Sequence, residues 1–306
     1  MIEVKDLSKH FGPTRAVDDI SFSIGKGEIV AFLGPNGAGK TTTMRMLTGY
    51  LIPTKGKCLI NGIDVTEEPI KTKELIGYLP EDNPLYPDMK VYEYLEFIGE
   101  IRKIKDLKNR VREVAEICGV TNVMNKEIGT LSRGYRQRVG VAQAIIHNPD
   151  ILILDEPTEG LDPNQVIELR NLIKELGKEK TVMLSTHILS EAEATCERVL
   201  IINKGKLVAD GSKNEIRMMA KGGETILLEL IAKQNPINEL KQISGIKEVT
   251  EKKSEDNHYQ YELLSEKDVR EIIFDTAVNK NWKIIELHRR ATSLEDIFRE
   301  LTKEDQ

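Results

Sequence analysis

The pattern of apolar and polar positions divides the chain into two parts. Up to about residue 217, short apolar runs alternate with stretches whose apolar residues recur at helical spacing, which is typical of an α/β sheet covered by helices. The mainly apolar segment 27–33 predicts a buried strand, and 40–47 predicts a helix. The continuous apolar run at 151–154 is expected of a central parallel strand that is buried on both faces.

Two further helical patterns, 91–98 and 107–117, follow each other with no strand pattern between them. They predict a helical insertion in the sheet at about 85–148. We therefore expect a first domain over residues 1–221, an α/β domain with this insertion.

The pattern restarts near Lys221-Gly222-Gly223. The remaining chain predicts strands at 225–231, 246–252, 258–264 and 283–288, and helices at 236–243, 267–280 and 294–303. The order β-α-β-β-α-β, followed by a helix, indicates a small ferredoxin-like α+β domain over residues 222–306.

Composition narrows the setting. Residues are 40% hydrophobic and 31% charged, with a formal charge of −6, as in an ordinary globular protein. No stretch approaches the roughly 18 apolar residues that a membrane helix needs, and the N-terminus lacks a secretory pattern. We expect a cytoplasmic protein whose membrane role, if any, depends on a partner. Three widely spaced cysteines favour neither disulfides nor a zinc site, and we expect them to be reduced and structural: Cys58, Cys118 and Cys196.

The firmest chemical signal is a glycine-rich loop between the strand at 27–33 and the helix at 40–47. It fits the P-loop pattern, in which backbone N–H groups approach phosphate oxygens closely. Lys40 would reach the β- and γ-phosphates, the Thr41 hydroxyl would bind Mg²⁺, and Thr42 would contact a phosphate. The nucleotide-binding residues predicted here are Gly34, Pro35, Asn36, Gly37, Ala38, Gly39, Lys40, Thr41 and Thr42.

A pair of carboxylates, Asp155 and Glu156, follows the apolar run at 151–154. In a P-loop protein the first would hold Mg²⁺, and the second would orient or deprotonate the attacking water. Taken alone, the same pair is also a common cap or turn signal.

The segment Leu131-Ser132-Arg133-Gly134, which we call the signature segment, lies just before this pair. With these spacings the first domain resembles the ATP-binding subunits of ABC transporters. The resemblance implies that Ser132 and Gly134 contact the γ-phosphate of ATP held by a second copy of the chain or by a paralogous ATPase subunit. The alternative is an ordinary serine-capped helix start.

The same resemblance assigns three further residues. Phe11 would stack on adenine, although a phenylalanine is otherwise often part of a core. Asp162, in Gly160-Leu161-Asp162, would line the dimer seam near the nucleotide. His187 would contact the γ-phosphate or hold Glu156 and water in place.

Two positions depart from the family pattern. Glu81 stands where a glutamine usually joins Mg²⁺ and water to the transporter contact. Its carboxylate could still hold a metal-bound water, but it adds negative charge near the triphosphate. Glu159 stands where a small residue is common. With the run Tyr135-Arg136-Gln137-Arg138, both changes resemble a subgroup that includes drug-efflux and gliding-motility ATPases.

The resemblance also implies a membrane permease as partner, with the chain on the inner face of the cell membrane. The segment 81–94 is the docking candidate, although its apolar side chains could equally pack internally: Leu85, Tyr86, Val91 and Tyr92. The stretch 293–298 resembles the C-terminal region of export ATPases of this type, for which we expect dimerisation or regulation. From Gly222 onward acidic residues outnumber basic ones, 18 to 13, so no nucleic acid is expected as a partner even though Tyr259 and Tyr261 would share a strand face.

The leading hypothesis is an ATP-hydrolysing subunit that dimerises around ATP and drives a separate permease, with export favoured by resemblance. The alternatives are a soluble ABC ATPase that acts on nucleic acid or ribosomes, and a nucleotide-gated regulatory module with little turnover. The single P-loop and the absence of sustained heptads disfavour the nucleic-acid class.

Overall fold

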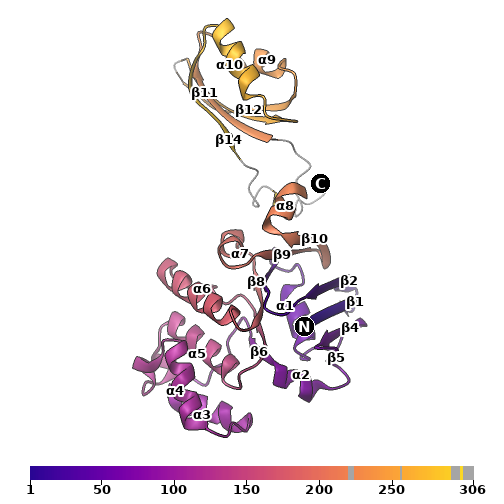
Figure 1. Ribbon diagram of the computed structural model, residues 1–306, viewed down its shortest axis with the longest axis vertical. Coiled ribbons are helices and arrows are strands. Elements are labelled where there is room, and N and C mark those ends of the chain that lie inside the picture. The colour runs from indigo at the N-terminus through magenta and orange to yellow at the C-terminus, as the bar shows by residue number, and fades with distance from the viewer. Residues whose placement is uncertain (220–223, 256, 291–296, 299–306) are drawn as a thin grey trace. The chain divides into compact units, whose positions relative to one another are not determined.

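The computed structural model describes residues 1–219, 224–255, 257–290 and 297–298 (Figure 1). The chain forms two compact units, the first spanning Met1–Lys213 and the second beginning at Asn214. The sequence pattern placed the division after Lys221. Helix α8 (Lys213–Met219) accounts for this difference, since its residues after Lys213 group with the second unit.

The first unit is built on a six-stranded sheet in the order β10-β9-β3-β8-β7-β6. All neighbouring strands are parallel except β10, which runs antiparallel to β9. The predicted strands at 27–33 and 151–154 are β3 and β7, and every residue of β7 is buried, as expected of a central parallel strand. The strands are β3 (Ile29–Leu33), β6 (Ile76–Leu79), β7 (Ile151–Leu154), β8 (Thr181–Thr186), β9 (Arg198–Asn203) and β10 (Lys206–Ser212).

A second, antiparallel sheet in the first unit was not predicted. Its order is β2-β1-β4-β5, with β1 (Ile2–Phe11), β2 (Thr14–Ile24), β4 (Lys55–Ile60) and β5 (Ile63–Asp64). Buried and exposed positions alternate only over parts of β1 and β2, because the register of the β1–β2 pair shifts after Val4 and Leu7. Asp6, inside the first shift, has a φ of 48°. Such irregularities interrupt the two-residue period by which a strand is recognised.

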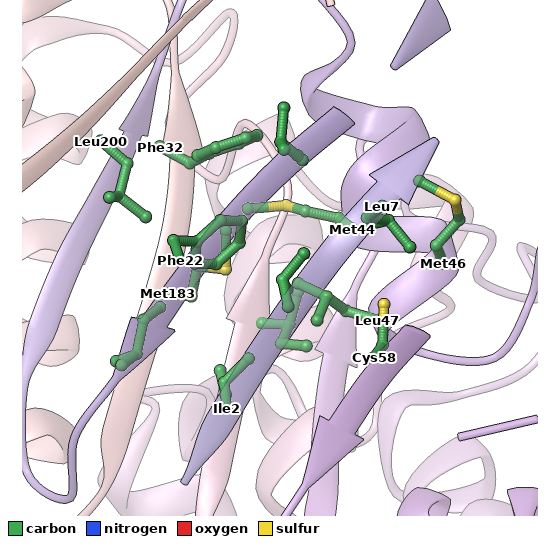
Figure 2. Close-up of a cluster of buried hydrophobic side chains, with 14 of the residues drawn as sticks. Ile2, Leu7, Phe22, Phe32, Met44, Met46, Leu47, Cys58, Met183 and Leu200 are labelled. Atoms are coloured by element: carbon green, nitrogen blue, oxygen red, sulfur yellow. The ribbon is translucent and has the colours of Figure 1, made fainter. Parts of the chain in front are cut away.

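Helix α1 (Lys40–Leu47), which follows the P-loop, packs into the core that both sheets share. Figure 2 shows Met44, Met46 and Leu47 of this helix beside side chains of the antiparallel sheet, and all three are fully buried. In the same cluster the rings of Phe22 and Phe32 lie 5.8 Å apart. Helix α1 is therefore held in place by close packing of its apolar side chains in this core.

Helices α3 (Val91–Ile101), α4 (Leu107–Ile117) and α5 (Arg133–Ile145) form the predicted insertion and lie together in Figure 1. Arg110 of α4 donates hydrogen bonds to the carbonyls of Ile145 and Ile146, at 2.6 and 2.8 Å, and so satisfies the end of α5. The remaining helical elements are α2 (Pro69–Leu75), α6 (Pro163–Gly177), α7 (Leu189–Thr195), and the short 3₁₀ turns η1 (Thr121–Val123) and η2 (Ile128–Thr130).

The second unit has the expected β-α-β-β-α-β order and an antiparallel sheet in the order β12-β13-β11-β14, the ferredoxin-like arrangement. Tyr259 and Tyr261 stack on each other inside its core, so their rings are not on an open face. The helix expected at 294–303 and the stretch 293–298 lie outside the described residues except for 297–298. The elements are β11 (Glu224–Ile231), α9 (Ile237–Lys241), β12 (Ile246–Glu255), β13 (His258–Ser265), α10 (Arg270–Asn279) and β14 (Lys283–Arg290).

Two further features bear on the sequence analysis. In the part of the chain that the structure describes, no helix combines the length and apolar character needed to cross a bilayer. Cys58, Cys118 and Cys196 are unpaired and buried, and burial raises the pKa of each thiol to about 12. They are weak nucleophiles at neutral pH and serve as core residues.

Candidate functional site

The P-loop between β3 and α1 has a backbone that requires glycine. Gly37 and Gly39 have φ values of 78° and 108°, in the left-handed region. A Cβ atom on Gly39 would lie 2.4 Å from the carbonyl oxygen of Ala16, and one on Gly34 would lie 2.4 Å from that of Ile202. No side chain caps the N-terminus of α1, so its first N–H groups are available to an anion.

A cavity of about 340 Å³ opens beside this loop. It is lined by residues of the P-loop and α1, by Ala16, and by side chains from three other segments. Gly34, Pro35 and Ala38 shape the loop without lining the cavity. The lining residues are Ala16, Asn36, Gly37, Gly39, Lys40, Thr41, Thr42, Glu81, Glu156, Glu159 and His187.

Lys40 is the cation at the base of this cavity. Its side chain is 6% exposed, and Nζ donates to the carbonyl oxygens of Gly34 at 2.8 Å and Pro35 at 3.2 Å. The same Nζ lies 3.2 Å from Glu156 Oε1. A buried ammonium that is held only by carbonyls and one carboxylate can neutralise an incoming phosphate.

Glu156 and His187 form the second group in the cavity. His187 Nδ1 lies 3.0 Å from Glu156 Oε2, which leaves the other ring nitrogen for a ligand. Glu156 has a φ of 46°, unfavourable for a residue with a Cβ, and its N–H donates to Ser185 Oγ at 2.8 Å. The structure thus brings the three predicted catalytic residues, Lys40, Glu156 and His187, into one site.

Asp155, Thr41 and Glu81 form an oxygen-rich group beside them. Thr41 Oγ1 lies 3.3 Å from both Asp155 Oδ1 and Glu81 Oε2. Asp155 is fully buried, and its Oδ2 has no hydrogen-bond partner among the described residues. Burial raises the pKa of Asp155, against the hydrogen bonds from Ser185 and Thr41. A buried carboxylate oxygen left open beside a hydroxyl and a second carboxylate suits a hard cation such as Mg²⁺.

The other predicted site residues lie outside this cavity. Phe11, at the end of β1, is 49% exposed, and Lys9 Nζ lies 5.2 Å from the centre of its ring. Ser132 is exposed and caps α5 by accepting the N–H of Tyr135 at 3.4 Å. The capping alternative is therefore realised, and contact with a nucleotide on a second chain stays a prediction.

Gly134 and Asp162 both lie beside Gln165 near the start of α6. A Cβ atom on Gly134 would lie 2.6 Å from the end of the Gln165 side chain, which would have to shift to make room for it. Asp162 caps α6 by accepting the N–H of Gln165 at 3.0 Å. Their expected places at a dimer seam stay predictions.

Two groups of residues in the site were missed by sequence reasoning. Ser185 contacts both Asp155 and Glu156. Glu191 accepts hydrogen bonds from the hydroxyls of Thr158 and Thr186 and so ties the residues after Asp155-Glu156 to those before His187. The sequence offered one signal for Ser185: it is a polar residue that directly follows an apolar run in a strand expected to be buried.

The docking candidate at 81–94 is only partly on the surface. Val91 is fully buried, which corrects its place among the exposed docking residues. Tyr86 is 52% exposed, and its ring contacts the edges of Tyr94 and Phe97, each with centroids 5.9 Å apart. A polar cleft of about 370 Å³ adjoins the segment and is lined by Glu81, Asp82, Asn83, Arg133, Arg136, Gln137 and Glu159.

Both units of the chain match models of known protein families. Residues 17–159 match the family model described as ABC transporter, and residues 211–302 match the model described as ATP-binding protein DrrA1-3-like, C-terminal domain. The second match covers most of the ferredoxin-like unit.

Three similar proteins extend these matches. The uncharacterized ABC transporter ATP-binding protein YxlF of Bacillus subtilis is 33% identical over 300 residues, 97% of this chain and 98% of that protein. The linearmycin resistance ATP-binding protein LnrL of Bacillus subtilis is 34% identical over 232 residues, 74% of each chain. A dimeric post-hydrolysis structure of the ATP-binding cassette MJ0796 bound to ADP and Pi has a TM-score of 0.64 and 26% identity, over 69% of this chain and 98% of that one. The chain belongs to the family of ABC transporter ATP-binding proteins.

Proposed function

We propose that the chain hydrolyses ATP as the motor subunit of an ABC exporter whose membrane permease is a separate polypeptide. The observation that carries the proposal is the joint placement of Lys40, Glu156 and His187 around one cavity, with two contacts of 3.2 and 3.0 Å that meet on the two oxygens of Glu156. A lysine, a carboxylate and a histidine so arranged are the groups that phosphoryl transfer to water requires.

Each residue has a chemical role in this proposal. Lys40 and the uncapped N–H groups of α1 neutralise the phosphates. Glu156, held by His187, orients the attacking water and accepts its proton. Asp155, Thr41 and Glu81 would hold Mg²⁺, which supplies charge stabilisation at the phosphate oxygens when bound. Phe11 would stack on the adenine.

The nucleotide site is proposed to be completed by a second copy of the chain. Ser132 is exposed at the start of α5 and does not line the cavity of its own chain, which is consistent with a contact in trans. Gly134 and Asp162 would lie at the same seam. Closure around ATP and release after hydrolysis would provide the mechanical output.

The output is proposed to act on an integral membrane permease, with the chain held at the inner face of the membrane through that partner. Exposed Tyr86 and the polar cleft that includes Arg133 and Arg136 provide the docking surface. Export is supported by the resistance protein LnrL among the relatives. The second unit would serve dimerisation or regulation.

Two experiments test the proposal. Purified chain should hydrolyse ATP in the presence of Mg²⁺, and Glu156→Gln should abolish turnover while ATP binding remains.

An affinity-tagged chain should recover an integral membrane protein from detergent-solubilised membranes, and Tyr86→Ala should recover less of it because its docking surface is weakened. Recovery of ribosomes or nucleic acid in place of a membrane protein would favour the soluble ABC ATPase, and binding without turnover would favour a regulatory module.

A further inference from the structure

A buried hydroxyl on β8 joins the two acidic residues that follow β7. Ser185 is 0% exposed. Its Oγ donates to Asp155 Oδ1 at 2.6 Å and accepts the N–H of Glu156 at 2.8 Å. One side chain therefore contacts the carboxylate at the strand end and the backbone of the next residue.

The contact to Glu156 matters because of the backbone there. A φ of 46° is unfavourable for a residue other than glycine and persists only where the surroundings enforce it. A buried N–H without an acceptor would add to that cost. By accepting this N–H, Ser185 supports the conformation in which the Glu156 carboxylate reaches both Lys40 and His187.

The contact to Asp155 selects between the two oxygens of its carboxylate. Oδ1 receives the hydroxyl of Ser185 and lies 3.3 Å from Thr41 Oγ1, whereas Oδ2 has no partner in the described ranges. Fixing one oxygen sets the rotation of the carboxylate and leaves the other open to a ligand. Groups that orient a ligand in this way strongly affect the affinity of a metal site.

We propose that Ser185 is a positioning residue that aligns the carboxylate of Asp155 and the backbone of Glu156 through a single hydroxyl. It touches neither the nucleotide nor the cation. The inference rests on the proposed function, in which these two residues serve Mg²⁺ binding and hydrolysis.

The test compares Ser185→Ala with a matched loss of a buried hydroxyl on the same strand. Thr181 is 1% exposed, and its hydroxyl accepts the N–H of Gly27 at 2.9 Å, at the other end of β8 from the acidic pair. Thr181→Val therefore reports the general cost of such a loss. Ser185→Thr, which keeps a hydroxyl, is the rescue variant, and Ser185→Cys replaces Ser185→Ala if the latter does not fold.

Four quantities are measured: ATP affinity in EDTA, ATP affinity with Mg²⁺, kcat and KM. Ser185→Ala should bind ATP in EDTA within about twofold of the wild type, while kcat and the affinity gained from Mg²⁺ each fall roughly 10- to 100-fold. Ser185→Thr should recover most of both, and Thr181→Val should keep both even where its melting temperature falls equally.

The proposal is overturned if Ser185→Ala keeps the gain in affinity from Mg²⁺ and the kcat, or if Thr181→Val loses them to the same extent. Loss of ATP binding in EDTA by Ser185→Ala would also overturn it, because the defect would then not be confined to the two carboxylates. A wild-type chain that binds ATP without hydrolysing it would contradict the proposed function alone. The Mg²⁺-dependent affinity would still decide the role of Ser185.

Discussion

The P-loop side and the signature side of the first unit differ in how completely their own chain satisfies them. Lys40, Asp155 and Glu156 are buried and linked to one another or to neighbouring strands by short contacts. Ser132 is exposed, and its side chain caps its own helix through a contact of 3.4 Å. The charged groups on the P-loop side therefore have their partners within their own chain. The signature side has an exposed serine that caps its own helix, and we propose that its ligand lies on another molecule.

This difference separates two kinds of evidence. On the P-loop side the structure shows which groups lie within contact distance of one another. On the signature side it shows what Ser132 does inside its own chain. A contact between Ser132 and a nucleotide on a second chain is tested by experiments with two chains.

Removal of the P-loop cation should have the largest effect. Lys40→Ala leaves Glu156 without its 3.2 Å partner and the phosphates without a buried positive charge, and we expect ATP turnover to fall by about 100-fold or more. The rate of phosphate release at steady state measures this turnover. Lys178→Ala removes an exposed cation paired with Glu175 and should stay near the wild type. If ATP turnover survives in Lys40→Ala, the P-loop side does not take part in catalysis.

On the signature side, Ser132→Asp and Ser132→Asn form a matched pair. Both side chains can cap α5, so the melting temperatures should agree. Only the aspartate brings negative charge toward a γ-phosphate in trans, and we expect its kcat/KM to be roughly 10- to 100-fold below that of the asparagine variant. Equal values would mean that Ser132 acts only as a cap.

The far end of α5 should respond to pH. Burial, with the charge of Arg102, lowers the pKa of His147 from 6.5 to about 4, and its Nε2 lies 3.0 Å from the Ile76 carbonyl oxygen. As pH falls below 6.5, His147 takes up a proton in the unfolded chain before it does so in the folded chain. The free energy of unfolding therefore decreases between about pH 6.5 and pH 4. The loss between pH 7 and pH 5 is about 2 kcal/mol.

Urea unfolding at the two pH values measures this loss. His147→Gln should lose that part of the pH dependence, with other titrating groups unchanged. An identical pH dependence in the variant and the wild type would show that His147 does not carry it.

The smallest effect is expected at the rim of the cavity. Glu81 is exposed and lies near Thr41, where its charge opposes a triphosphate. Glu81→Gln should raise ATP affinity in EDTA by roughly two- to fivefold, as for a single exposed charge. Weaker binding by the variant would contradict this electrostatic assignment.

The sequence predicted most of the fold because local patterns were strong. Helix α1 and the buried strand β7 have the residue bounds that the pattern indicated, and the second unit has the predicted order of strands and helices. The antiparallel sheet was missed because shifts in register around Asp6 break its alternation. Ser185 was missed because its partners, Asp155 and Glu156, are distant in sequence and meet it only through the pairing of β7 with β8.

The central claim, a site shared between two chains, is tested most directly by the mass of Glu156→Gln in solution with ATP. Light scattering should show one chain, 34.6 kDa, without nucleotide and twice that mass with ATP, and Ser132→Asp in the same background should stay at one chain. A mass that remains at 34.6 kDa while ATP is bound at saturation would contradict the claim.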